Sequence, residues 1–176
     1  VLTAEMQNTD KIVTLIDECQ DMGLTIIPPD INQGEFNFVV NGRGEIVYGL
    51  GAIKGLGEGP VENILKARVE GPFNELLEFC LRVDIRSVNE RTIKALIRSG
   101  ALDGLVEGDI DYSRAFLSAT LAEAMQAAEQ RTRNHASGVD DLFGNITPRE
   151  MINGNPHQSG FRLRPWTEQQ RLIAEK

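Results

Sequence analysis

Cysteine, histidine and aromatic residues are scarce in this sequence. Its 176 residues include two cysteines, two histidines and 6% aromatic residues. A disulfide framework or a zinc site needs more of these ligands at close spacing, so their scarcity argues against both. Cys19 and Cys80 stand among apolar residues at helical spacing, and we expect two buried thiols in a reducing compartment.

Long apolar runs are also missing. No stretch approaches the roughly 18 residues that cross a bilayer, and no basic segment followed by an apolar one marks a signal peptide. With 41% hydrophobic and 25% charged residues, the chain has the composition of a globular protein of one or two small domains. It begins with Val1 and stops at Lys176 inside an expected helix, so we expect a piece of a longer protein.

Positive charge is in deficit. Lysine and arginine number 18 against 26 aspartates and glutamates, which gives a net charge of −8 and a pI near 4.8. This balance argues against a broad basic face for nucleic acid. A small site that contacts a few phosphates through backbone N–H groups and one or two lysines remains compatible with it. Any DNA affinity should be modest and sensitive to salt.

The first 48 residues mix helix and strand signals. We expect a helix over about residues 8–22, with Thr9 as its N-cap and Gly23 as its C-terminal stop. Residues 24–27 read as a short buried strand that ends at two prolines. The turn sequence Asn41-Gly42-Arg43-Gly44 between two apolar runs predicts a β-hairpin.

Helices separated by glycines follow, so we expect a mainly α, α+β fold. The expected helices run from Pro60 to about Val69, from Pro72 past Leu81, from Ser87 to Ser99 and from Tyr112 to about Arg133. Residues rich in Gly, Asn, Pro, Ser and Thr then predict a linker. The expected division is a mixed α/β block at 1–48, a helical domain at 49–133, a linker at 134–165 and the start of a truncated helix at 166–176.

The most informative stretch is YGLGAIKGLGEGPVENILKAR, residues 48–68. A glycine–hydrophobe–glycine turn between two helices is the core of a helix-hairpin-helix motif. The glycines permit a tight turn and a close phosphate, the hydrophobe plugs the core, and the next helix offers free N–H groups. Five glycines within eleven residues favour phosphate contact over a purely structural turn. The candidate DNA-binding residues here are Lys54, Gly55, Leu56, Gly57, Gly59, Lys66 and Arg68.

A second, degenerate hairpin follows at residues 93–102. Its turn has Gly100 but no second glycine two positions later, so a helix that simply ends at a glycine is an equal alternative. Two hairpins related by approximate symmetry would form a five-helix unit that grips both strands of a duplex. Lys94, Arg98 and Gly100 are its candidate DNA-binding residues.

These residues resemble the α subunit family of bacterial DNA polymerase III across nearly the whole chain. LTAEMQNTDKIVTLIDEC and IIPPDIN look like the end of that family's fingers domain. YGLGAIKGLGEGP and LIRSGALDGL look like its tandem helix-hairpin-helix domain, and DDLFG and RPWTEQQ extend the match. The resemblance implies a cytoplasmic, nucleoid-associated protein of DNA replication that binds duplex or primer–template DNA without reading sequence.

The resemblance also implies that the catalytic residues lie elsewhere. The family's nucleotidyltransferase chemistry uses magnesium held by palm-domain aspartates that precede this stretch, so we expect no catalytic residue, metal site or cofactor here. Whether the chain counts as an enzyme is left open. We assign Asp103, Asp109 and Asp111 to a solvated loop. His135 and His157 have no nucleophile or metal cluster at useful spacing, which disfavours an independent hydrolase.

The expected linker contains a candidate docking peptide. Asp140, Asp141, Leu142 and Phe143 look like the segment by which this family binds the β sliding clamp. Leu142 and Phe143 would be apolar anchors for a pocket, although Val139 stands where the family usually has glutamine. The alternatives are that these two residues pack on a neighbouring helix, or that clamp docking is the main function and the hairpins are structural. We expect a monomer that works with other holoenzyme subunits.

Overall fold

The structure, a computed structural model, describes residues 1–136 and begins with a mixed α/β block. A short helix, α1 (Leu2–Glu5), leads into α2 (Thr9–Asp21). The N-cap of α2 is Asn8 and not Thr9 as expected, because the Asn8 side chain accepts the Lys11 N–H at 3.2 Å. Gly23 follows the helix with φ at +76°, as the sequence predicted.

Three two-residue strands form the sheet of this block. β1 (Ile26–Ile27) runs parallel to β3 (Ile46–Val47), and β2 (Val39–Val40) pairs with β3 in the antiparallel sense. The β3 strand is therefore central, in the order β1-β3-β2. The predicted hairpin between β2 and β3 is confirmed, although its ladder is shorter than expected. The side chain of Asn41 holds the turn by accepting the N–H groups of Arg43 and Glu45.

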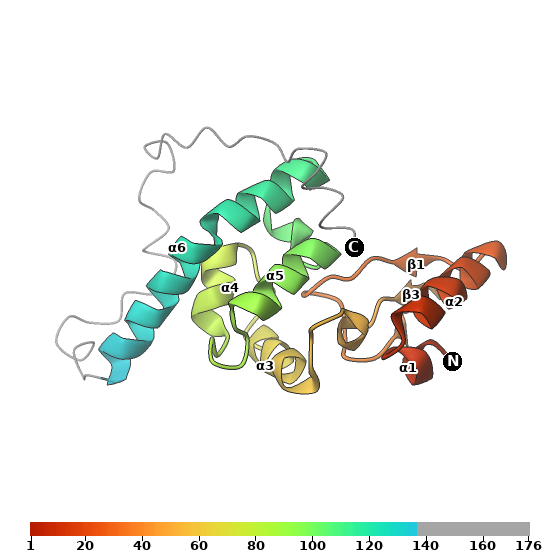
Figure 1. Ribbon diagram of the computed structural model, residues 1–176, viewed down its shortest axis with the longest axis horizontal. Coiled ribbons are helices and arrows are strands. Elements are labelled where there is room, and N and C mark those ends of the chain that lie inside the picture. Colours follow the sequence, from red (N-terminus) through yellow and green to blue (C-terminus); the bar gives the residue numbers. More distant parts are fainter. Residues whose placement is uncertain (137–176) are drawn as a thin grey trace.

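Four helices and two 3₁₀ turns follow, and they contain most of the core. The turn η1 (Leu50–Ala52) precedes α3 (Glu58–Arg68), α4 (Leu76–Arg82), α5 (Glu90–Ser99), η2 (Asp103–Leu105) and α6 (Ile110–Ala136). Figure 1 shows α6 lying along α4 and α5, and the residue contacts agree. The mainly α, α+β fold predicted from the sequence is confirmed.

Three helix starts differ from the expected ones. Helix α3 begins at Glu58, so Pro60 lies in its first turn but does not open it. Helix α4 begins at Leu76, four residues after Pro72. The N-cap of α5 is Asn89, whose side chain accepts the Thr92 N–H at 3.0 Å, and the expected Ser87 cap is wrong. Asn89, two residues after Ser87, satisfies the start of this helix by itself.

Arginine side chains join the parts of the fold. The guanidinium of Arg68 donates to the carbonyls of Ile31 and Gly34 and pairs with Glu35 at 2.7 Å. Because Arg68 closes α3 while its three partners precede η1, this group ties the opening block to the helical unit. The side-chain amide of Asn32 donates to the carbonyl of Phe73 and accepts the N–H of the same residue.

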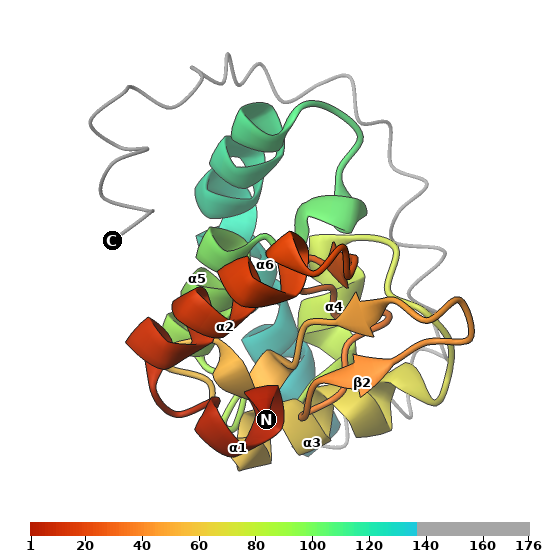
Figure 2. The ribbon, with the colours of Figure 1, turned by 90° about the vertical axis from the view of Figure 1, so that its right-hand side faces the viewer.

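Figure 2 shows α1, α2 and β2 on the face of the molecule opposite to α6.

The second joining arginine is Arg82. It donates to the carbonyls of Ala67, Gly71 and Pro72 and pairs with Glu78 at 2.9 Å. Its guanidinium also lies 4.5 Å from the centre of the Phe73 ring. The loop between α3 and α4 has no regular secondary structure, and these contacts hold it in place.

The two cysteines of the described part are free thiols in different surroundings. Cys80 is buried, and burial raises the pKa of its thiol to about 12, whereas Cys19 is only half-buried. No helix among residues 1–136 is long and apolar enough to span a membrane. The same residues hold no group of three or more His, Cys, Asp or Glu side chains that could bind a metal ion.

Candidate nucleic-acid interface

The glycine turn between η1 and α3 has the geometry that the sequence predicted at two of its three positions. Gly55 has φ at +94°, a conformation that glycine adopts without strain. Leu56 is 6% exposed and plugs the turn into the core. Gly57 differs from the expectation of a positive φ, because at φ −92° and ψ 173° it is the extended N-cap of α3. The turn therefore needs glycine for its conformation only at Gly55.

Free backbone donors surround this turn. No side chain caps the N-terminus of α3. Within residues 1–136, the N–H groups of Gly55, Gly57, Glu58 and Gly59 donate no hydrogen bond. The first turn of a helix combines such orphan donors with the positive end of its dipole, which favours an anion. The exposed carboxylate of Glu58 stands in the same turn and opposes this preference.

Two of the five clustered glycines have a different explanation. A Cβ at Gly49 would lie 2.8 Å from backbone atoms of Asn37 and Phe38, and one at Gly51 would lie 2.6 Å from the Phe36 ring. Both glycines are therefore required by close packing against the strand segment before β2. The density of glycine in this stretch is weaker evidence for phosphate contact than the sequence alone suggested.

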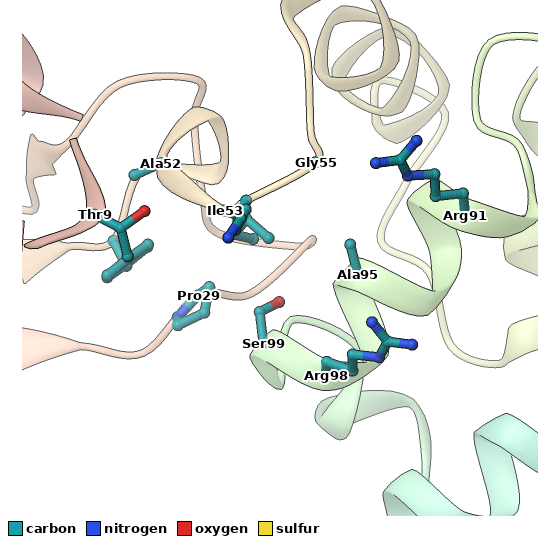
Figure 3. Close-up of a pocket in the computed structure, with 11 residues that line it drawn as sticks. Thr9, Pro29, Ala52, Ile53, Gly55, Arg91, Ala95, Arg98 and Ser99 are labelled. Carbon is teal, nitrogen blue, oxygen red and sulfur yellow. The ribbon is translucent and has the colours of Figure 1, made fainter. Parts of the chain in front are cut away.

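The turn opens on a cavity of about 650 Å³ whose charged lining is entirely basic. Lys54 and Gly55 line it, together with Arg91, Ala95 and Arg98 of α5. Figure 3 shows Gly55 across from these three residues of α5. The remaining lining residues are Thr9, Pro29, Tyr48, Ala52, Ile53 and Ser99, so no carboxylate lines it. Burial raises the pKa of the Tyr48 hydroxyl, which keeps this group neutral. Such a cavity suits an anionic ligand.

The three cations of this cavity have no ion-pair partner among the described residues. Lys54, Arg91 and Arg98 have no carboxylate within 4.0 Å among the described residues. Most other cations of residues 1–136 are paired, including Lys11 with Glu5 and Lys94 with Glu90. Unpaired basic side chains around free N–H groups are the pattern of a phosphate contact site.

The structure brings together only part of the predicted DNA-binding set. Lys54, Gly55 and Arg98 meet at the cavity, with Leu56 buried beneath the turn. Lys66 lies near the end of α3, 3.9 Å from Glu62, and Lys94 pairs with Glu90 at 2.6 Å. Arg68 is committed to the carbonyls and carboxylate of the opening block. We therefore leave Arg68 out of the site.

Sequence reasoning missed Arg91. It lies seven positions before Arg98 with Ala95 between them, and this spacing places all three on one face of α5. The spacing was visible in the sequence. What it could not indicate was that this face lies across from Gly55, since a Cβ at Gly55 would be 3.9 Å from the Ala95 side chain.

The second predicted turn uses its first two N–H groups within the end of α5. The N–H of Gly100 donates to the carbonyl of Ile97, and the next N–H donates to the carbonyl of Leu96. A Cβ at Gly100 would lie 2.7 Å from the Arg114 guanidinium and 2.9 Å from the Asp103 carboxylate. Those two side chains form an ion pair at 3.0 Å over the turn. Gly100 therefore ends α5, and a phosphate contact there is not supported.

The same ion pair corrects the assignment of Asp103 to a solvated loop. Asp103 begins η2 and is part-buried against Arg114. Asp109 is exposed as expected, and its side chain accepts the Tyr112 N–H at the start of α6. Both carboxylates therefore have partners within the fold.

The candidate clamp-binding peptide, Asp140, Asp141, Leu142 and Phe143, lies outside the described residues. The expected final helix, 166–176, and all of the expected linker, 134–165, except residues 134–136 also lie outside them. Residues 134–136 belong to α6 and not to a linker. Helix α6 reaches Ala136, three residues past the expected domain end at residue 133.

Comparison with known proteins gives two kinds of match. A family model described as the helix-hairpin-helix motif matches residues 23–113. The chain is 51% identical over 189 aligned residues to DNA polymerase III subunit alpha of Pseudomonas aeruginosa. It is 47% identical to the proteins of the same name from Haemophilus influenzae and Escherichia coli K12. Each match covers 100% of this chain but only 15% to 16% of the relative.

Proposed function

The chain belongs to the helix-hairpin-helix motif family and corresponds to a stretch of DNA polymerase III subunit alpha, and from this we propose that it binds duplex DNA during replication. The observation that carries the proposal is the cavity beside Gly55. There, Gly55 and three cations without a carboxylate partner among the described residues line one space, and no carboxylate lines it. Phosphate is the DNA group that fits these donors.

The proposed contact reads no sequence. Lys54 and the backbone N–H groups suit a charged phosphate oxygen, which every nucleotide carries whatever its base. A net charge of −8 opposes DNA elsewhere on the surface. The affinity should therefore be modest, local to this site and lost as salt rises.

We propose that this site holds primer–template duplex while other parts of a longer protein carry out nucleotide transfer with magnesium. The chain spans 16% or less of the relatives above, which leaves room for such parts. Other holoenzyme subunits would be its partners in the bacterial cytoplasm. In this view the described residues position DNA and do not react with it.

A second candidate function concerns residues 140–143. Leu142 and Phe143 would insert into a hydrophobic pocket of the β sliding clamp, with the two preceding aspartates beside them. The sequence pattern supports this proposal, and the valine at position 139 lowers the affinity that we expect. In the alternative in which clamp docking is the main function, the hairpins are only structural. This alternative predicts that changes at Gly55 leave clamp binding intact.

Fluorescence anisotropy of a labelled primer–template duplex tests the main proposal. The wild-type chain should bind at low salt, and Lys54→Glu should weaken binding by about tenfold or more, because one contact becomes a repulsion. Arg43→Glu is the matched control, since Arg43 is an exposed cation at the β2–β3 turn, outside the cavity. It should retain most of the affinity.

Absence of binding by the wild-type chain even at low salt would contradict duplex binding. Clamp docking would then become the leading function. A parallel titration with purified clamp, using Leu142→Ala and Phe143→Ala, measures that activity independently of Lys54.

A further inference from the structure

The two hairpin turns are not equivalent. The turn at Gly55 has free N–H groups, whereas the N–H at Gly100 is used within the end of α5. An anion that approached Gly100 would also meet the carboxylate of Asp103, which lies over that turn. The two turns therefore offer different N–H groups and different charges to a phosphate.

Helix α5 nevertheless has a basic face. This face lines the cavity beside the Gly55 turn of the first hairpin. Arg91 and Arg98 are exposed, lie two helical turns apart and line the cavity beside Gly55 (Figure 3). Ala95 between them is small, which lets the Gly55 turn approach the helix. Lys94, the third basic residue of α5, is instead paired with Glu90.

Building on the proposed function, we propose that Arg91 and Arg98 join Lys54 and the Gly55 turn in one composite site for the sugar–phosphate backbone of a single DNA strand. The second hairpin contributes its helix to this site and contributes no turn of its own. The chain therefore contacts one strand of a duplex here.

The dimensions agree with this assignment. Seven residues of α-helix advance about 10 Å, roughly the axial length of three nucleotide steps of one strand at about 3.4 Å each. Arg91 and Arg98 can therefore contact different phosphates of the same strand, with Lys54 and the turn on the facing side. A guanidinium binds phosphate through two parallel N–H donors, which suits both positions.

Salt titrations of arginine variants test the inference. Binding of a duplex and of a single-stranded oligonucleotide is measured by anisotropy for the wild-type chain and for an Arg91→Gln/Arg98→Gln double variant. Arg86→Gln is the matched control, because Arg86 is exposed and unpaired among described residues but does not line the cavity. Circular dichroism checks that each variant folds. We expect the double variant to fold, because neither cavity arginine makes a side-chain hydrogen bond or ion pair within residues 1–136.

The expected result is a loss of salt dependence that matches two phosphate contacts. In plots of log affinity against log salt, the slope for duplex should fall in magnitude by about 1.8, and that for the single strand by about 1.4. Duplex affinity should drop by about tenfold or more at low salt. The control variant should keep the wild-type slopes. A merely structural role of the arginines would change stability without changing slope.

Two results would overturn the inference and leave the proposed function standing. In the first, the double variant keeps the wild-type slopes while Lys54→Gln lowers them, which means that the hairpin contacts DNA alone. In the second, the double variant weakens duplex binding only, which means that the arginines reach a second strand. Failure of the proposed function looks different, because the wild-type chain itself would then bind neither probe.

Discussion

Gly57 separates the stability of the hairpin from its proposed contact with DNA. It is the N-cap of α3, its φ of −92° suits any residue, and a Cβ there would meet only the Pro60 ring at 3.9 Å. Aspartate at an N-cap accepts a helix N–H and stabilises the helix by a few tenths of a kcal/mol relative to glycine. It also places a negative charge where a phosphate would lie.

Gly57→Asp should therefore preserve or slightly raise the melting temperature and still reduce duplex binding by about tenfold or more. Gly57→Asn is the matched control, because it caps the helix without the charge and should bind better than the aspartate variant. Thermal unfolding followed by circular dichroism and anisotropy on the same samples give both quantities. Equal binding by the two variants would show that no phosphate approaches this turn.

At this scale the sequence predicted the turn residues well and the cations only in part. Gly55 and Leu56 were identified because a positive φ and a buried hydrophobe are local requirements of the turn. The sequence could not show that Arg68 turns to the opening block or that Arg91 lines the cavity, because the direction of a long basic side chain depends on residues far along the chain. The partners of Arg68 lie 33 to 37 positions away.

At the scale of single elements, the carboxylate of Glu78 stabilises helix α4. Glu78 accepts the backbone N–H of Asn74 at 3.0 Å and the Arg82 guanidinium at 2.9 Å. Burial alone would raise the pKa of Glu78, but the hydrogen bonds from Asn74 and Arg82 together with the arginine charge outweigh it and lower the pKa below 4.5. The folded protein therefore holds this proton less tightly than the unfolded chain.

The sign of the resulting pH dependence follows directly. Stability from Glu78 is fully present above pH 4.5 and is lost as pH falls through the lowered pKa of the folded state. Glu78→Gln should cost about 1–2 kcal/mol near neutral pH and less in acid, where the wild-type carboxylate is itself protonated. Urea unfolding at neutral pH and below pH 4.5 measures both differences.

Glu62→Gln is the control for this comparison. Its carboxylate lies 3.9 Å from Lys66 in an exposed pair, which should contribute well under about 1 kcal/mol at any pH. A Glu78→Gln effect that is equally small, or that does not diminish in acid, would contradict the role given to the ion pair with Arg82.

Element types were predictable because helical spacing and glycine stops are repeated signals, whereas element starts were not. Proline at residues 60 and 72 suggested two helix starts, yet the caps that the chain uses are Gly57 and Glu75. The strands are two residues long because the sheet pairs only where β3 reaches both neighbours. Such limits arise from tertiary contacts that no local pattern contains.

In the whole molecule, a charge of −8 and a small basic cavity act against each other. The sequence indicated a local phosphate site from this balance, but it could not place α5 beside the Gly55 turn. That placement depends on the packing of α5 on α6 and on the bond from the Ile31 N–H of the opening block to the carbonyl of Ala101, just after α5, at 3.0 Å.

The balance of charges sets how DNA affinity should depend on salt. Three cations that each neutralise one phosphate give a slope of about −2.7 in a plot of log affinity against log salt, because each contact contributes about −0.9. A broad basic face would give a slope several units steeper. Anisotropy titrations between about 50 and 200 mM salt measure this slope, across a range where affinity should fall by less than about two orders of magnitude. A slope steeper than about −5 would mean that cations beyond Lys54, Arg91 and Arg98 contact DNA, and the surface outside the cavity would have to supply them.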